Sequence, residues 1–169
     1  MSRGRGIAHD LGGVCHDAAV TVHGFVDESR RSGSYLLTVA VLRPAELAAM
    51  RTLLHGLRRP QDRRLHFKAM ADPRRRAVAA QLAATPVRCR VYTGRGRPEV
   101  ARQTCLARMV TELLTEHCQR LVLESRGPAD DRKDARTIHA ALAPAPSKSG
   151  LVYEHLRPYE DPLLWFPTQ

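Results

Sequence analysis

Carboxylate side chains follow two apolar segments of the sequence, and their type and position suit metal chemistry. Asp27 and Glu28 come directly after Val26, and Glu124 comes directly after Leu121–Leu123. In α/β sheets, side chains at strand ends meet at one edge of the sheet. Two or three converging carboxylates bind Mg²⁺ or Mn²⁺, because hard cations prefer oxygen ligands. A pair of such ions stabilises both the attacking and the leaving oxygen of a phosphodiester.

Two more carboxylates, Asp131 and Asp134, follow Glu124 closely and lie three residues apart, on one face of an expected helix. They could complete the metal site. The alternative is structural, since acidic residues are also typical of the first turn of a helix, where the helix dipole favours them. Likewise, Asp27-Glu28-Ser29 is also typical of a polar turn. The residues alone leave both interpretations open.

His66 lies between Leu65 and Phe67 and is the candidate auxiliary residue, either as a general acid or base or as a neighbour of a metal. A histidine among apolar residues is more often a structural hydrogen-bonding residue. No serine lies in a nucleophile-elbow pattern. Acyl transfer is therefore unsupported. The segment Gly94-Arg95-Gly96-Arg97 lacks the spacing of a phosphate-binding loop, so nucleotide binding is unsupported as well.

The charge is strongly positive, with 27 Lys and Arg against 17 Asp and Glu, a net charge of +10. A surplus of this size attracts phosphate polymers, although an arginine-rich composition gives the same surplus on any solvated surface. Arg74 and Arg75, near the start of an expected helix, and Arg95 and Arg97, in a glycine-containing loop, are the candidate contacts to a nucleic-acid backbone.

The elements that must position these side chains alternate between strands and helices. We expect strands over 20–27, 35–42, 87–93, 121–123 and 151–156, and helices over 44–57, 72–84, 99–117 and 130–142. Residues 28–33 are expected to be a polar turn that joins the first two strands in a hairpin. This order predicts an α/β protein with a mixed central β-sheet flanked by helices. We expect a flexible N-terminal leader over residues 1–19 and a single domain over 20–169.

The cysteines and the apolar runs indicate a cytoplasmic protein without a membrane segment. The four cysteines show no Cys-x-x-Cys pair and no zinc spacing, and Cys89 and Cys105 are expected to be small core residues. The longest apolar run, 34–42, is too short to cross a bilayer, and the first residues lack the apolar block of a signal peptide.

Six short motifs, taken in order, resemble the domain-of-unknown-function 3800 family of the ribonuclease H-like (integrase-type) superfamily. The resemblance runs from Val22 to Trp165. The motifs are Phe25-Val26-Asp27-Glu28-Ser29, Leu65-His66-Phe67, Leu121 to Arg126, Asp131 to Asp134, Tyr153-Glu154-His155 and Pro162-Leu163-Leu164-Trp165.

The resemblance implies a ribonuclease H-like fold and cleavage of nucleic acid that depends on Mg²⁺ or Mn²⁺. It makes Asp27 the lead metal ligand and Glu124 the second, with Asp131 and Asp134 as weaker candidates. Glu28 joins the catalytic group as a residue that supports the ligands.

Two positions depart from the family pattern. Arg30 replaces a glycine, and Thr168 stands where relatives carry an aspartate that begins a final helix. We therefore expect a C-terminally truncated copy, and a homodimer that covers the sheet face left without this helix. Three interpretations stay open: a metal-dependent nuclease, whose activity the missing carboxylate puts in doubt, a non-catalytic domain that binds nucleic acid or protein, and a remnant or scaffold domain without a site of its own. The choice between RNA and DNA is also open.

Overall fold

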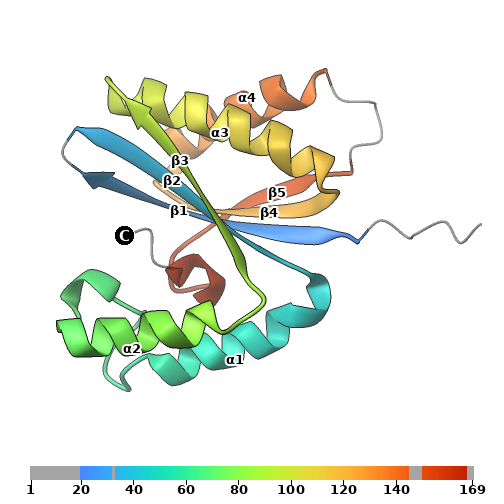
Figure 1. The fold of residues 1–169 in the computed structure, drawn as a ribbon. Helices are drawn as coiled ribbons and strands as arrows, with labels where there is room; N and C mark the ends of the chain where they lie inside the picture. Colours follow the sequence, from blue (N-terminus) through green and yellow to red (C-terminus); the bar gives the residue numbers. More distant parts are fainter. Residues whose placement is uncertain (1–19, 32, 145–149, 167–169) are drawn as a thin grey trace, which may run out of the picture.

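The computed structural model of the chain describes residues 20–31, 33–144 and 150–166. The expected leader over residues 1–19 and the departure at Thr168 lie outside these residues. The α/β class expected from the alternating pattern is confirmed, with a mixed sheet and helices on both of its faces (Figure 1).

The sheet has five strands in the order β3-β2-β1-β4-β5. The strands are β1 (Val22–Arg31), β2 (Ser34–Leu42), β3 (Arg88–Arg95), β4 (Cys118–Glu124) and β5 (Val152–Leu156). β1, β2 and β3 form antiparallel pairs, whereas β4 pairs with β1 and β5 in parallel. The parallel pairs require helical crossovers. This order is consistent with the ribonuclease H-like fold.

Helices cover the two faces of the sheet in separate layers (Figure 1). The helices are α1 (Leu47–Leu57), α2 (Asp72–Ala83), α3 (Pro98–Thr115) and α4 (Pro128–Leu142), and a 3₁₀ helix, η3 (Pro162–Trp165), lies near the end of the chain. α3 and α4 pack on one face, and α1, α2 and η3 pack on the other. Neighbours on β1 show the alternation, since Val26 packs with Leu106 and Phe25 packs with Leu54.

The first strand is longer than the sequence pattern predicts. Residues 28–31 continue the ladder, with Glu28 paired to Leu37 and Ser29 to Leu36, so a polar turn from residue 28 is wrong. The chain turns next to Gly33, whose φ of 77° suits glycine. Glu28 is partly buried because Arg102 of α3 and Tyr35 of β2 contact it, and Ser29 is buried, so these polar residues do not form a surface turn.

The apolar stripe predicted for the first helix is confirmed, because Leu47, Met50, Leu54 and Leu57 are all buried in α1. The prediction that Cys89 is a core residue is wrong, because Cys89 is exposed on the edge strand β3. Cys105 is buried, as expected. No helix in the described part of the chain is both long enough and apolar enough to cross a membrane.

Candidate functional site

Asp27 and Glu124 lie side by side in the sheet, on two neighbouring parallel strands: Glu124 ends β4, and Asp27 lies beside it on β1, which continues to Arg31. Val26 of β1 pairs with Leu123 of β4, and each carboxylate residue comes next on its strand. Asp27 shares a face with Phe25, and Glu124 shares a face with Val122, because side chains alternate along a strand. Phe25 and Val122 both belong to the core under α1, so the two carboxylates point to the same face of the sheet.

A pocket of about 330 Å³ contains both carboxylates. Its wall opposite the sheet is the loop between α1 and α2, which contributes the cationic or ionisable side chains of Arg64, His66 and Lys68. The remaining lining residues are Glu28, Leu65, Phe67, Leu164, Trp165 and Phe166. The pocket thus places acidic side chains on the sheet opposite basic side chains on a loop, which is the charge pattern expected of a site for a cation and a phosphate.

The loop that faces the carboxylates is held by its own buried residues and by α2. Leu65 and Met70 are buried in the core. The guanidinium of Arg74 donates to the carbonyl oxygen of Leu57 at 2.9 Å, and that of Arg75 donates to the carbonyl oxygen of Met70 at 2.9 Å. The two arginines expected to contact nucleic acid therefore also bond the chain at both ends of this loop, and their contact with nucleic acid stays a prediction.

Glu124 has a basic neighbour inside the pocket. Nη1 of Arg64 lies 3.7 Å from Oε1 of Glu124, and the two side chains are 40% and 25% exposed. The distance fits an ion pair but is longer than a hydrogen bond. Glu124 therefore keeps oxygen lone pairs that are available to another ligand.

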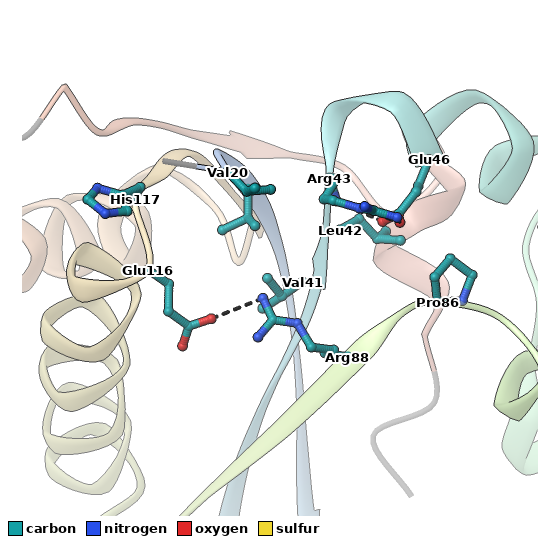
Figure 2. Close-up of a pocket in the computed structure, with 10 residues that line it drawn as sticks. Val20, Val41, Leu42, Arg43, Glu46, Pro86, Arg88, Glu116 and His117 are labelled. Carbon is teal, nitrogen blue, oxygen red and sulfur yellow. Dashed lines mark hydrogen bonds and ion pairs between the residues drawn. The ribbon is translucent and has the colours of Figure 1, made fainter. Parts of the chain in front are cut away.

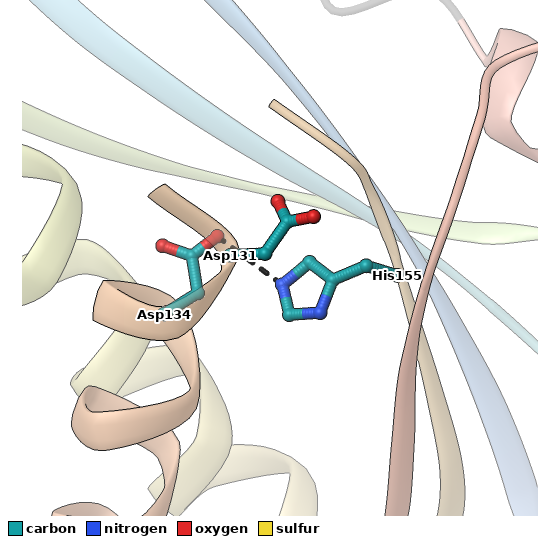
Figure 3. Close-up of side chains that lie close together, drawn as sticks. All are labelled: Asp131, Asp134 and His155. Atoms are coloured by element: carbon teal, nitrogen blue, oxygen red, sulfur yellow. Dashed lines mark ion pairs between the residues drawn. The ribbon is translucent and has the colours of Figure 1, made fainter. Parts of the chain in front are cut away.

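Asp131 and Asp134 do not line this pocket but lie together with His155 on the opposite face of the sheet, toward α4 (Figure 3). Their ligand atoms all lie within 4.8 Å of one another, and within the described residues no other group of three such side chains is that close. Nε2 of His155 lies 3.4 Å from Oδ2 of Asp134. The group is therefore close enough to hold a metal ion.

Two arginines already neutralise this group. Arg102 donates to the two oxygens of Asp134 at 2.8 and 2.7 Å, and Arg126 donates to Oδ1 at 3.0 Å. Burial alone would raise the pKa of Asp134, but the hydrogen bonds and the positive charge of Arg102 lower it well below its usual range. A divalent cation would have to displace these guanidinium groups, so the contacts favour a structural role.

Asp131 bonds the start of α4 to the end of β4. Its carboxylate accepts hydrogen bonds from the Ser125 hydroxyl at 2.6 Å and from the backbone N–H of Arg126 at 2.9 Å. This arrangement fixes the segment that follows Glu124. Asp131 and Asp134 thus lie on one face of α4, as expected. They are separate from the pocket that Asp27 lines.

Glu28 connects the pocket to the buried arginine. Its side chain lines the pocket and also accepts hydrogen bonds from the Tyr35 hydroxyl and from Arg102. Arg102, only 2% exposed, was missed by the sequence analysis. One signal was present, because Arg102 is spaced three and four positions from the buried Cys105 and Leu106 and therefore lies on the apolar stripe of its helix.

Arg95 and Arg97 lie past the two carboxylates along the strand direction, because Arg95 pairs with Ser34 and Ser34 pairs with Arg31, four residues after Asp27. β3 runs in the same direction as β1, since both are antiparallel to β2, and Arg95 ends β3. Both arginines are exposed, and neither has an ion pair among the residues that the structure describes. They are therefore free to contact an anionic polymer that extends from the pocket.

A larger pocket of about 470 Å³ lies at the other end of the sheet (Figure 2). Its charged lining residues are already paired, Arg88 with Glu116 at 3.1 Å and Arg43 with Glu46. Its walls include Val20 and Val41. It is lined by none of the candidate site residues named from the sequence. Its paired charges leave little electrostatic attraction for an ionic ligand.

Comparison with models of known protein families and with curated proteins gives no match to this chain. The resemblance to the domain-of-unknown-function 3800 family therefore depends on the six motifs alone, and the function has to be argued from the site.

Proposed function

We propose that the chain is a Mg²⁺- or Mn²⁺-dependent nuclease that hydrolyses phosphodiester bonds of nucleic acid, as a member of the ribonuclease H-like superfamily. One observation carries the proposal: Asp27 and Glu124 lie at adjacent positions on the same face of two parallel strands and line one pocket, opposite basic side chains. This is the arrangement in which carboxylates bind a hard cation and cations bind a phosphate.

The residues present fit a magnesium or manganese ion. Mg²⁺ is usually bound by one or two carboxylates, keeps several waters and takes further oxygens from the phosphates of its substrate. Asp27 and Glu124 supply two carboxylates. Thr38 adds a buried hydroxyl, 3% exposed and without a hydrogen-bond partner among the described residues, and it is the cross-strand neighbour of Asp27 on the same face. A bound ion would activate a water molecule and stabilise the charge that develops on the phosphate.

The side chains around the two carboxylates have separate tasks in this proposal. Glu28 holds the end of β1 in place through Arg102. His66 is exposed and lines the pocket, so it is placed to give a proton to the leaving oxygen. Arg95 and Arg97 bind phosphates further along the strand. The cytoplasm, with its reduced thiols, is the compartment that we propose.

The test is cleavage of end-labelled single-stranded RNA, single-stranded DNA and an RNA–DNA hybrid, each with Mn²⁺ and with EDTA. We expect cleavage only with Mn²⁺, and its loss in Asp27→Asn and in Glu124→Gln. Asp72→Asn is the control, since it removes an exposed carboxylate at the start of α2. Activity that survives Asp27→Asn would contradict the assignment of this pocket as the active site.

A second candidate function is binding of nucleic acid without cleavage. It is favoured by the net charge of +10 together with the exposed Arg95 and Arg97. It predicts binding in EDTA that weakens steeply with salt, because phosphate contacts release counterions. Binding that is equal for wild type and Asp27→Asn, with no cleavage of any substrate, would favour this function over the nuclease.

A further inference from the structure

The arginines around the loop that carries Arg64 differ in what they bond. Arg58, Arg74 and Arg75 each donate to a backbone carbonyl oxygen, of Asp62, Leu57 and Met70 respectively, and so hold the loop. Arg64 instead reaches into the pocket, where Nη1 lies 3.7 Å from Oε1 of Glu124. That separation is too long for a hydrogen bond, so the contact is electrostatic only.

The contact between Arg64 and Glu124 is easily exchanged, because it depends on charge alone and the Arg64 side chain is partly exposed. Arg64 keeps 40% of its side chain exposed, and such pairs contribute little to stability. Loss of this contact therefore leaves the loop in place, because the loop is fixed by Leu65, Met70 and the two α2 arginines. Arg64 is free to change partner without unfolding its surroundings.

From these contacts we propose that Arg64 is an exchangeable counter-ion of Glu124 that couples metal binding to phosphate binding. The proposal depends on the proposed nuclease site. Without ligands, Arg64 neutralises Glu124 and competes with a divalent cation for its oxygens. When the cation takes Glu124, the guanidinium turns to a non-bridging oxygen of the nucleic-acid phosphate, for which its planar donors are suited.

Lys68 supports this assignment, because it adds a second positive charge to the same wall of the pocket, where it is exposed. The pocket therefore offers a phosphate at least one cation that remains after Arg64 has neutralised Glu124. Thr38 supports the cation half of the exchange, since its buried hydroxyl beside Asp27 has no partner within the described residues.

The first experiment is calorimetric titration of Mn²⁺ alone into wild type, Arg64→Gln and Arg63→Gln. Arg63 is the matched control, because it is an exposed arginine one position earlier in the same loop. Removal of a positive charge beside the ligand should tighten Mn²⁺ binding by roughly three- to tenfold in Arg64→Gln, from Coulomb attraction in a solvated site. Arg63→Gln should stay close to wild type.

The outcomes separate this inference from the proposed function. Equal or weaker Mn²⁺ binding by Arg64→Gln, with wild-type binding that Asp27→Asn abolishes, overturns the counter-ion role and leaves the metal site standing. Binding by Arg64→Gln but not by wild type supports the inference. Absence of Mn²⁺ binding in every variant overturns both.

The second experiment tests the phosphate half with a short single-stranded DNA carrying a fluorescent label, in EDTA. The Glu124→Gln protein is used because its Arg64 has lost the carboxylate partner. Adding Arg64→Gln to it should lower the slope of log K against log salt by about one, as expected for one lost phosphate contact. An unchanged slope overturns Arg64 as a phosphate contact.

Discussion

The guanidinium of Arg102 donates two hydrogen bonds to the carboxylate of Asp134, at 2.8 and 2.7 Å, in the interior between α3, α4 and the sheet. The two side chains are 2% and 0% exposed. Arg102 also bonds Glu28, which is next to Asp27. One buried ion pair thus connects both helices of this layer to the part of β1 that carries the candidate metal ligand.

Asp134→Asn should strongly destabilise the fold, because it leaves the charge of Arg102 buried without its main partner. Breaking a buried pair of this kind costs about 3–5 kcal/mol. The measurement is urea denaturation followed by circular dichroism. Asp130→Asn is the control on the same helix, since Asp130 forms a partly exposed pair with Lys133, and it should unfold as wild type does. Equal stability of both variants would show that Arg102 finds another partner.

Acid should destabilise the wild type through the same carboxylate. The pKa of Asp134 is lowered in the folded state by Arg102, against the effect of burial. Its contribution is therefore complete above the unfolded-state pKa, roughly 4, and is lost as the pH falls from there toward the lower folded-state pKa. Free energies of unfolding measured from neutral pH downward should fall below about pH 4, and the fall should be shallower in Asp134→Asn. Parallel curves for the two proteins would contradict this assignment.

The elements of the fold follow from local patterns, and most were predictable. The four buried leucine and methionine residues of α1 repeat at spacings of three and four, and the strands at 34–42 and 118–124 carry continuous apolar runs. The alignment of Asp27 with Glu124 was also predictable, because each residue directly follows an apolar segment of its strand, although β1 continues past Asp27 to Arg31. The pocket that both carboxylates line, and the position of the loop between α1 and α2 opposite them, could not be predicted.

The contacts that could not be predicted from the sequence join positions that are far apart in the chain. Glu28 and Arg102 are 74 positions apart, and Arg51 and Asp161 are 110 apart, so no local spacing marks either pair. The second pair shows the consequence. Arg51 holds the buried Asp161, whose carboxylate also accepts from the N–H of Leu163, so the segment from Asp161 to Phe166 is a buried part of the core. The homodimer stays a prediction.

Gly94→Ala should destabilise the packing of α3 on β3. A Cβ at Gly94 would lie 2.8 Å from Cβ of Ala101 and 3.1 Å from its backbone, and a backbone cannot move aside as a flexible side chain can. Overpacking of this kind costs about 1–3 kcal/mol. Gly56→Ala is the control, since a Cβ there meets nothing within 4 Å, and alanine in helix α1 should stabilise by up to about 1 kcal/mol. Thermal denaturation measures both, and destabilisation by both variants would contradict this packing argument.

Thr38→Val should separate stability from metal binding. The Thr38 hydroxyl is buried and has no hydrogen-bond partner in the part of the chain that the structure describes, so its replacement by a methyl group of similar shape should leave stability unchanged or raise it by up to about 1 kcal/mol. If this hydroxyl bonds a water of the ion held by Asp27, Mn²⁺ affinity should fall several-fold in calorimetry. Thr93→Val, on the neighbouring edge strand and exposed, should change neither quantity. A loss of stability with unchanged Mn²⁺ affinity would remove Thr38 from the site.

Arg95→Gln and Arg97→Gln should each weaken nucleic-acid binding in a salt-dependent way. Both guanidinium groups are exposed at the end of β3, in the direction in which β1 continues past Asp27, so each lost phosphate contact should lower the slope of log K against log salt by about one. The control is Arg108→Gln, which removes the same formal charge from the middle of α3, where Arg108 bonds Glu112 at 2.8 Å. Fluorescence anisotropy of a labelled single strand at several salt concentrations gives the three slopes. A slope lowered equally by Arg108→Gln would mean that binding follows net charge and not this edge of the sheet.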